Sequence, residues 1–234
     1  MGRLLVLWDV DYTLVDSDGI GRQLYETAFG ELYGRPMPQP GSMSGRTDRA
    51  IALEVLTLAA VPQPEAALGP FHDVMAAHAA ELAGLVAERS RVLPGAAEAM
   101  SALARLDVVQ SLLTGNMRPL AEVKLGPLGL TEHLDLDVGA YGDAHAVRAE
   151  LVHLARDRAA RAYGCDFGGT ATVLVGDTPL DVGAALATGA RAVGVATGQF
   201  TAEELAASGA HAVLPDLADT DRTVAAILDA EPRP

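Results

Sequence analysis

Short apolar runs alternate with amphipathic segments along most of the chain. The runs are rich in Val, Leu and Ala, and they end in small or polar residues. They predict β-strands at about residues 3–10, 107–114, 136–141, 171–176, 191–195 and 211–214. Intervening segments such as GAAEAMSALARL and AVRAELVHLARDRAARAYG carry apolar residues at helical spacing. This alternation predicts an α/β fold: a doubly wound parallel sheet with helices on both faces.

The interval from residue 16 to residue 90 lacks this alternation. It contains helical stretches separated by PMPQPGSMSGRTD and VPQPEAAL, whose Pro and Gly residues interrupt regular structure. Such an interval is too long for one crossover between neighbouring strands. We therefore predict an all-helical domain at residues 16–90, inserted into a core domain that consists of residues 1–15 and 91–234.

Composition and charge restrict the partners and the cellular location. The formal net charge of −14 at pH 7 repels nucleic acid and anionic membranes, so we expect neither as a partner. No apolar stretch approaches the roughly 20 residues that span a membrane, and the N-terminal apolar run meets Asp9 too soon for a signal peptide. The single cysteine, Cys165, fits a reducing cytoplasm. We expect a cytoplasmic protein, with a homodimer among the options for its oligomeric state.

Three of the expected strands end in acidic, hydroxyl or amide side chains. These strand ends are WDVDYTL, SLLTGN and VLVGDTPLD, which contain Asp9, Asp11 and Thr13, then Thr114, Gly115 and Asn116, and finally Asp177 and Asp181. Because the carboxyl ends of parallel strands meet at one edge of a doubly wound sheet, we expect Asp9, Thr114 and Asp177 to converge.

Such a group of residues suits phosphate chemistry. Asp9 and Asp177 would repel each other unless a cation lay between them, and Mg²⁺ prefers carboxylate and carbonyl oxygens. One Asp could then attack phosphorus, while the Thr114 hydroxyl and the amides around Gly115 bind phosphoryl oxygens. Asp11 would be the general acid for the leaving alkoxide and then the base for water. Either acidic motif alone is explained as turn and helix-cap residues, but their combination favours a site.

The motifs together resemble those of the haloacid dehalogenase-like superfamily of phosphohydrolases. LLVLWDVDYTL resembles the first motif, SLLTGN the second and VGDTPLDVGAALATGA the fourth, and the similarity covers essentially the whole chain. The resemblance implies a Rossmann-like core, a helical type I cap as in the phosphoglycolate phosphatase-like branch, and Mg²⁺ as cofactor. It implies Asp9 as nucleophile, Asp11 as acid/base and Thr114 as a phosphoryl binder. The implied metal ligands are Asp9, the Asp11 carbonyl and Asp177, with Asp181 in support.

Two cationic positions remain open in this comparison. The third motif of the family is a Lys or Arg before the fourth motif, and Arg148 has the expected separation from Asp177. Lys124, the single lysine of the chain, follows the second motif and is the other candidate. We favour Arg148. In GRTDRAI, which resembles the specificity loop of the family, Arg46 is a candidate for contacting the leaving group or a second anionic substituent.

These observations predict a phosphatase that acts on a small phosphorylated metabolite, with Thr13, Gly115 and Asn116 as further substrate-binding candidates. A phosphotransferase or mutase of the same superfamily is an alternative. Dehalogenation is disfavoured because Asp11 is present, and phosphonate cleavage because residues 16–90 contain no lysine. A receiver-like module that stores an aspartyl-phosphate is the alternative from another class, but such modules are much shorter. Phosphoglycolate, sugar phosphates and nucleoside monophosphates all stay open as substrates.

Overall fold

A parallel β-sheet forms the centre of the molecule. The structure is a computed structural model, and it describes residues 3–228. The sheet has five strands in the order β4-β1-β5-β6-β7. The strands are β1 (Leu4–Trp8), β4 (Val108–Leu112), β5 (Thr172–Gly176), β6 (Arg191–Val195) and β7 (Ala212–Leu214). The expected α/β fold with a parallel sheet is confirmed.

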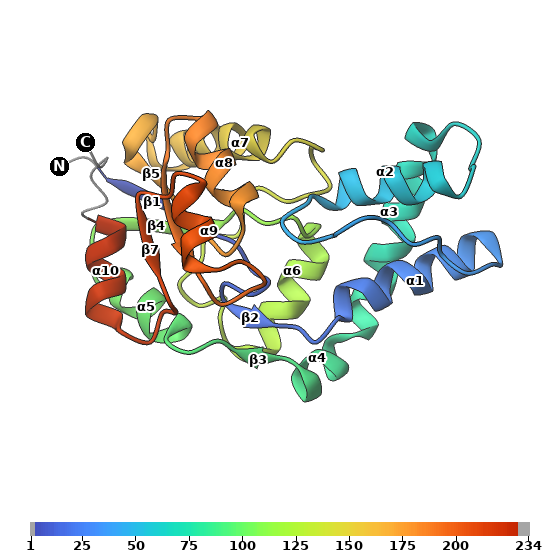
Figure 1. The fold of residues 1–234 in the computed structure, drawn as a ribbon, viewed down its shortest axis with the longest axis horizontal. Helices are drawn as coiled ribbons and strands as arrows, with labels where there is room; N and C mark the ends of the chain where they lie inside the picture. The colour runs from blue at the N-terminus through green and yellow to red at the C-terminus, as the bar shows by residue number, and fades with distance from the viewer. Residues whose placement is uncertain (1–2, 229–234) are drawn as a thin grey trace.

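Helices cover both faces of this sheet (Figure 1). One face packs against α5 (Ala96–Leu103), α6 (Arg118–Leu125) and α10 (Thr220–Leu228), and the other against α7 (Arg148–Tyr163), α8 (Pro179–Ala187) and α9 (Ala202–Ala207). Val6 and Trp8 point to the first face, and Leu5 and Leu7 to the second. Because successive side chains of a strand alternate between faces, a strand buried on both sides needs an apolar residue at every position. This explains the uninterrupted run in β1.

The predicted strand at residues 136–141 is wrong. Only an isolated bridge joins Ala140 to Leu113 beside β4. The Asp135 carboxylate accepts the Asp137 N–H at 3.1 Å, and this Asx turn curls the chain away from an extended path. The Tyr141 hydroxyl then donates to the Leu136 carbonyl at 2.6 Å and holds the curled segment in place. The apolar residues are buried as expected, but the acidic residues between them select turns.

A group of helices lies beside the core, at the right of Figure 1. These helices are α1 (Ile20–Tyr33), α2 (Asp48–Leu58), α3 (Pro64–Glu81) and α4 (Ala83–Arg89). They follow β2 (Val15–Asp16) and precede β3 (Arg91–Val92), which pair antiparallel, so the chain enters and leaves the helical group at the same place. Their apolar residues form a separate cluster around Phe29, Phe71 and Met75, which Met117 and Leu120 of the core join. This arrangement suits an inserted helical domain, whose limits at 16–90 stay a prediction.

The remaining regular elements are short. Two 3-10 helices, η1 (Gly126–Leu128) and η2 (Gly169–Ala171), lie in the connections of the core. Within residues 3–228, none of the helices combines the length and the apolar character that crossing a bilayer requires.

A buried polar side chain ties the strands β1 and β4 to α5. The amide oxygen of Gln110 accepts the indole N–H of Trp8 at 3.1 Å, and its amide nitrogen donates to the Met100 carbonyl at 2.9 Å. Gln110 is only 3% exposed, so these groups have no access to water. The two hydrogen bonds therefore satisfy the indole N–H of Trp8 and both polar atoms of the Gln110 amide, which the core would otherwise bury without partners.

Gln110→Leu should lower the free energy of unfolding by about 1–3 kcal/mol, because it leaves the Trp8 N–H buried and unpaired, whereas the Met100 carbonyl keeps its hydrogen bond from the Ala104 N–H. In a Trp8→Phe background the same substitution should cost less, since the indole N–H that it orphans is already absent. Urea unfolding of the wild type, both single variants and the double variant measures the coupling. Additive losses would contradict the assigned hydrogen bond.

Candidate functional site

The sheet order brings the three motifs to one edge. β1 lies between β4 and β5, and the chain crosses from one side of β1 to the other after β4. Trp8, the last residue of β1, is in register with Leu112 and Val175. The residues that follow the three strands therefore start at the same level, at the point where the strand order reverses. Ligands of open α/β sheets bind in such a crevice.

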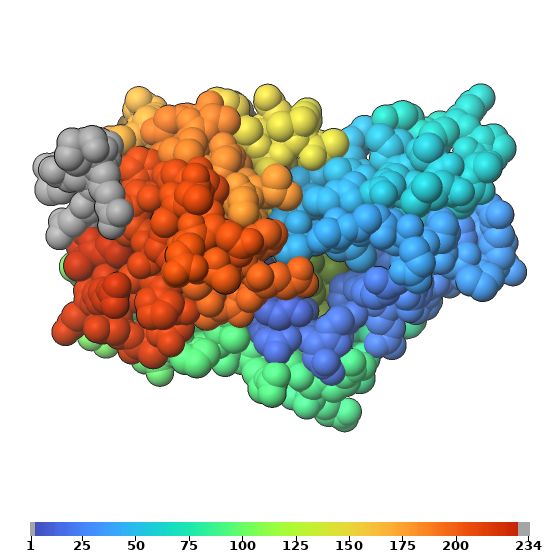
Figure 2. All heavy atoms as spheres, in the orientation of Figure 1, coloured from blue at the N-terminus to red at the C-terminus, as the bar shows by residue number. Residues whose placement is uncertain are grey.

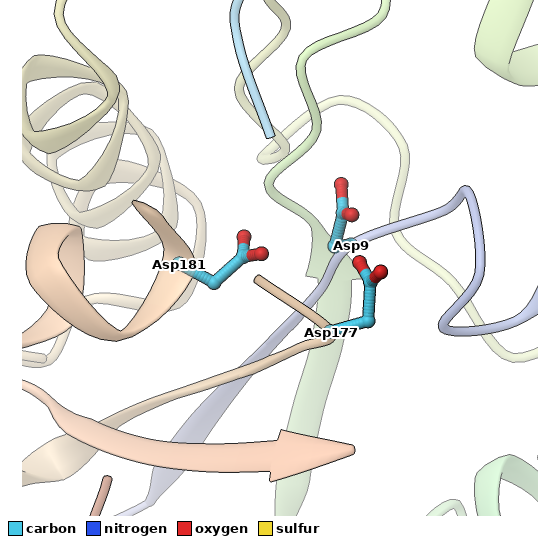
Figure 3. A group of neighbouring side chains, drawn as sticks. All are labelled: Asp9, Asp177 and Asp181. Carbon is cyan, nitrogen blue, oxygen red and sulfur yellow. The ribbon is translucent and has the colours of Figure 1, made fainter. Parts of the chain in front are cut away.

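Three buried carboxylates converge at this edge (Figure 3). Asp9 follows β1, Asp177 follows β5, and Asp181 lies in the first turn of α8; each offers an oxygen within 4.8 Å of the others. Burial and the neighbouring carboxylates raise the pKa of Asp177 to about 9, and burial raises the pKa of Asp9 to about 7 although a neighbouring Arg opposes the shift. The Oδ2 atom of Asp177 is buried and has no hydrogen-bond partner. These acids therefore form a site that favours a cation.

Arg148, at the start of α7, joins two of these acids. Its Nη2 atom lies 2.7 Å from Oδ1 of Asp9 and 2.6 Å from Oδ1 of Asp181. Its Nη1 atom donates to the Gly45 carbonyl at 3.0 Å, across the junction with the helical group. Burial opposes the charged guanidinium, but the Asp181 and Asp9 carboxylates outweigh it and raise the pKa of Arg148. The other oxygen of Asp181 accepts hydrogen bonds from the backbone and hydroxyl of Thr178, so its carboxylate is fixed at both oxygens.

Lys124 contacts a different acid. From α6, its ammonium nitrogen lies 2.7 and 2.6 Å from the two oxygens of Asp11 and 2.8 Å from the amide oxygen of Asn116. Asn116 and Ser17 also donate to Asp11, at 2.8 and 2.7 Å. Burial raises the pKa of Asp11, but Lys124 and these hydrogen bonds more than offset it, so the pKa lies below its usual value. The two cations that the sequence left as alternatives thus serve two separate carboxylates.

The end of β4 supplies a hydroxyl beside the acids. Thr114 is fully buried, and its Oγ1 atom accepts hydrogen bonds from the backbone and side-chain nitrogens of Asn116 at 3.2 and 2.8 Å. A Cβ atom on Gly115 would lie 2.1 Å from the Arg46 carbonyl oxygen, so the close approach of the helical group requires glycine there. Thr13 is also fully buried, and the structure does not bring it to the cavity that the other motif residues line.

A cavity of about 400 Å³ separates the acids from the helical group, a size within the range of small-molecule sites. Figure 2 shows a hollow at this junction. The charged residues of its lining are Asp9, Asp11, Lys124, Arg148 and Asp177 of the core and Arg22, Arg46 and Asp48 of the helical group. Asp181 supports this lining from behind, through Arg148.

Asp48 and its partners were not recognised in the sequence as part of the site. Thr47 is the N-cap of α2, and Asp48 reaches the core instead: its carboxylate accepts the Met117 N–H at 2.6 Å and the Tyr25 hydroxyl at 2.9 Å. Burial raises the pKa of Asp48 to about 6. Its backbone N–H also donates to the Gly115 carbonyl at 2.7 Å. No local sequence signal predicts contacts between residues so distant along the chain.

Arg46 lines the cavity with its charge already paired. Its guanidinium forms an ion pair with Glu54 and donates to the carbonyls of Ser42 and Ala50 at 3.2 and 3.3 Å. The structure therefore brings Arg46 to the expected place, and shows it engaged by groups of its own segment.

Comparisons with known proteins agree with the motifs and the fold. The sequence matches the family model described as haloacid dehalogenase-like hydrolase over residues 6–186. No curated protein matches the chain by sequence.

Several solved structures share the fold over nearly their whole length. A predicted phosphatase from Clostridium acetobutylicum is 18% identical, with a TM-score of 0.68 over 98% of this chain and 100% of that one. CbbY from Rhodobacter sphaeroides, solved with xylulose-(1,5)bisphosphate, is 20% identical, with a TM-score of 0.67 over 93% and 96%. A predicted phosphoglycolate phosphatase from Haemophilus somnus is 17% identical, with a TM-score of 0.64 over 94% and 96%. The family match spans most of the chain and contains the three motifs, and so this protein belongs to the haloacid dehalogenase-like hydrolases.

Proposed function

We propose that the protein is a Mg²⁺-dependent phosphatase that hydrolyses the monoester of a small phosphorylated metabolite through an aspartyl-phosphate on Asp9. The observation that carries this proposal is the buried group of Asp9, Asp177 and Asp181, of which Asp9 and Asp177 line a cavity that a small molecule fits. The family of hydrolases supports it, as do the phosphatase names among the similar structures.

The donor set fits Mg²⁺. Three buried carboxylates within 4.8 Å of one another repel strongly without a cation, and Oδ2 of Asp177 has no partner in the protein. We propose Asp9, Asp177 and the Asp11 carbonyl as ligands. Asp181 would play a supporting role, because Arg148 and Thr178 already engage its two oxygens. Bound Mg²⁺ would neutralise the charge shared by the carboxylates and the phosphoryl group and orient that group.

Arg148 prepares Asp9 for attack on phosphorus. It binds Oδ1 of the carboxylate at 2.7 Å, which fixes the orientation of the group and leaves the other oxygen free to act as nucleophile. Thr114 is prepared in a similar way. Its hydroxyl oxygen already accepts two hydrogen bonds from Asn116, so its proton is free to be donated to a phosphoryl oxygen.

Asp11 carries the proton in both steps. In the first step Asp9 attacks phosphorus, the ester bond breaks, and the leaving alkoxide takes the proton from Asp11. In the second step the Asp11 carboxylate removes a proton from water as the water attacks the phosphoryl group on Asp9, and phosphate leaves. The proton taken from water is the one donated to the next alkoxide. Lys124 stabilises the anionic form of Asp11 that acts in this second step.

Transfer to another acceptor and phosphoryl storage remain weaker alternatives. The family of hydrolases to which the chain belongs argues against transfer. The helical group beside Asp9 and Asp177 argues against storage, because a receiver-like module does not need it. The net charge of −14 supports a small metabolite rather than nucleic acid as the partner. The single cysteine supports a cytoplasmic location.

Asp9→Asn should lower kcat by about 1000-fold or more in the presence of Mg²⁺, because an amide is a poor nucleophile for phosphorus. The measurement is release of phosphate from a panel of phosphorylated metabolites. Asp157→Asn, at an exposed position on α7, is the matched control and should keep wild-type activity. Comparable activity of the Asp9 variant would exclude it as the nucleophile.

Asp11→Asn should separate the two chemical steps. With p-nitrophenyl phosphate the leaving group needs little protonation, so Asp9 still becomes phosphorylated, whereas hydrolysis of the phosphoenzyme loses its base. We expect a burst of about one p-nitrophenolate per enzyme followed by slow turnover, measured by stopped-flow absorbance. Loss of the burst together with turnover, in a variant that still binds phosphate, would contradict the role of base.

Asp177→Asn should change the dependence of stability on pH and on metal. Because the folded pKa of about 9 lies above the ordinary value of 3.8, this carboxyl binds its proton more tightly in the folded state, and the metal-free protein loses stability as pH rises from 4 to 9. The variant lacks this loss, so in EDTA its Tm should exceed that of the wild type, by an amount that grows with pH.

Adding Mg²⁺ in the same thermal unfolding experiment should stabilise the wild type more than Asp177→Asn, whereas in EDTA the variant is the more stable protein. At about a hundred times its Kd, Mg²⁺ should raise the Tm of the wild type by about 5–10 °C and leave that of Asp177→Asn nearly unchanged. Equal shifts in the two proteins would show that Asp177 does not hold the ion.

A further inference from the structure

The cations that line the cavity are each matched by a carboxylate of the chain. On the core side, Arg148 binds Asp9 and Asp181, and Lys124 binds Asp11. On the side of the helical group, Arg22 pairs with Glu26 at 3.0 Å and Arg46 with Glu54. The two arginines that the helical group contributes to the lining are therefore both paired with carboxylates of that group.

The pair of Arg46 and Glu54 lies next to the phosphoryl-binding end of the cavity. The Arg46 carbonyl packs so closely on Gly115 that a Cβ atom there would collide with it. The Arg46 guanidinium turns away from this contact to Glu54 and to two backbone carbonyls. Glu54 is in turn anchored by the Gly41 N–H at 3.0 Å. The Arg46 guanidinium is thus held by its own segment, and Glu54 neutralises its charge.

Apart from Asp48, whose carboxylate accepts hydrogen bonds from the Met117 N–H and the Tyr25 hydroxyl, the remaining polar groups of this part of the cavity are uncharged. Ser42 and Ser44 line it from the loop before α2, Tyr12 from the turn after β1, and Gln199 from the loop after β6. Hydroxyl and amide groups both donate and accept hydrogen bonds, which suits the hydroxyl groups of an alcohol. A carboxylate or a second phosphate would find no net positive field here, and burying it would leave its charge uncompensated.

We propose that the leaving group of the substrate is an uncharged hydroxylated alcohol, and that the pair of Arg46 and Glu54 sets this selectivity. The inference rests on the proposed phosphatase function and deepens it by specifying the substrate class. Glu54 acts as a specificity-determining residue through Arg46: it keeps the guanidinium from serving as a binding site for a second anion. Monoesters of small polyols and neutral sugars are then preferred over phosphorylated acids and bisphosphates.

Matched pairs of esters test this selectivity on the full-length enzyme with Mg²⁺. Ethylene glycol monophosphate is compared with phosphoglycolate, glycerol 3-phosphate with 3-phosphoglycerate, and fructose 6-phosphate with fructose 1,6-bisphosphate. The members of each pair have the same carbon skeleton and differ in one anionic group. We expect kcat/KM to favour the uncharged member by about tenfold or more, because the anion meets no free cation. Equal or reversed preference across the pairs would overturn the proposal.

Glu54→Gln tests the assigned cause. The glutamine carbonyl can still accept the Gly41 N–H, but it no longer neutralises Arg46. The variant should raise kcat/KM for the anionic member of each pair relative to the uncharged member by about threefold to tenfold. The ratio is taken within one preparation, so partial misfolding does not affect it.

Glu65→Gln is the matched control. It removes one negative charge from the same helical group, at an exposed pair with Arg49 outside the cavity lining, and it should leave the ratio unchanged. An unchanged ratio in Glu54→Gln, or an equal change in both variants, would overturn the role of the pair.

The outcomes also separate this inference from the proposed function. Turnover of p-nitrophenyl phosphate that depends on Mg²⁺ and Asp9, combined with a preference for the phosphorylated acids, would contradict the selectivity alone. The lack of turnover of every ester would contradict the phosphatase function, and the selectivity would fall with it.

Discussion

Mutual repulsion of buried carboxylates is the constraint on which the site depends. Asp9, Asp177 and Asp181 lie within 4.8 Å of one another and are nearly inaccessible to water. A single guanidinium, that of Arg148, contacts two of them and cannot neutralise three. The raised pKa values of Asp9 and Asp177 express the cost that remains. A divalent ion would remove this cost, and the same ion would serve the chemistry of a phosphoryl group.

The two buried cations divide the work between the two acids of the first motif. Arg148 binds one oxygen of Asp9, the proposed nucleophile, and Lys124 binds both oxygens of Asp11 and favours its anionic form. Arg148 also binds the Gly45 carbonyl of the helical group. The position of this group is therefore connected by one side chain to the orientation of the Asp9 carboxylate. Such a connection would allow the helical group to exclude water from the cavity and to orient the Asp9 carboxylate at the same time.

The sequence predicted those features that depend on periodicity and on strand ends. Continuous apolar runs identified β1 and β5, and the rule that parallel strands end at one edge placed Asp9 near Asp177. The apolar run at residues 136–141 likewise predicted a strand, but this prediction failed. Hydrogen bonds that involve the side chains of Asp135 and Tyr141 curl that segment. The turn at Asp135 thus determined the backbone conformation, whereas the apolar residues indicated only that the segment is buried.

Contacts between side chains that are distant along the chain, or on separate elements, could not be predicted in this way. Spacing favoured Arg148 over Lys124 as the third-motif cation, but it could not show that Lys124 folds back onto Asp11 from α6. Nor could it show that the Asp48 carboxylate accepts the Met117 N–H or that Glu54 forms an ion pair with Arg46. The contact of Asp48 depends on how the helical group docks, and the other two depend on how neighbouring elements pack within one part of the chain. No short stretch of sequence encodes either kind of packing.

The central claim is that Asp9 and Asp177 share a divalent ion. Anomalous diffraction from crystals grown with Mn²⁺ and a phosphate analogue tests it most directly, because Mn²⁺ takes the oxygen ligands that Mg²⁺ takes and can be located unambiguously. The account predicts one strong peak at about 2.0–2.3 Å from a carboxylate oxygen of each residue. A peak elsewhere, with the two side chains contacting only Arg148 and each other, would contradict it.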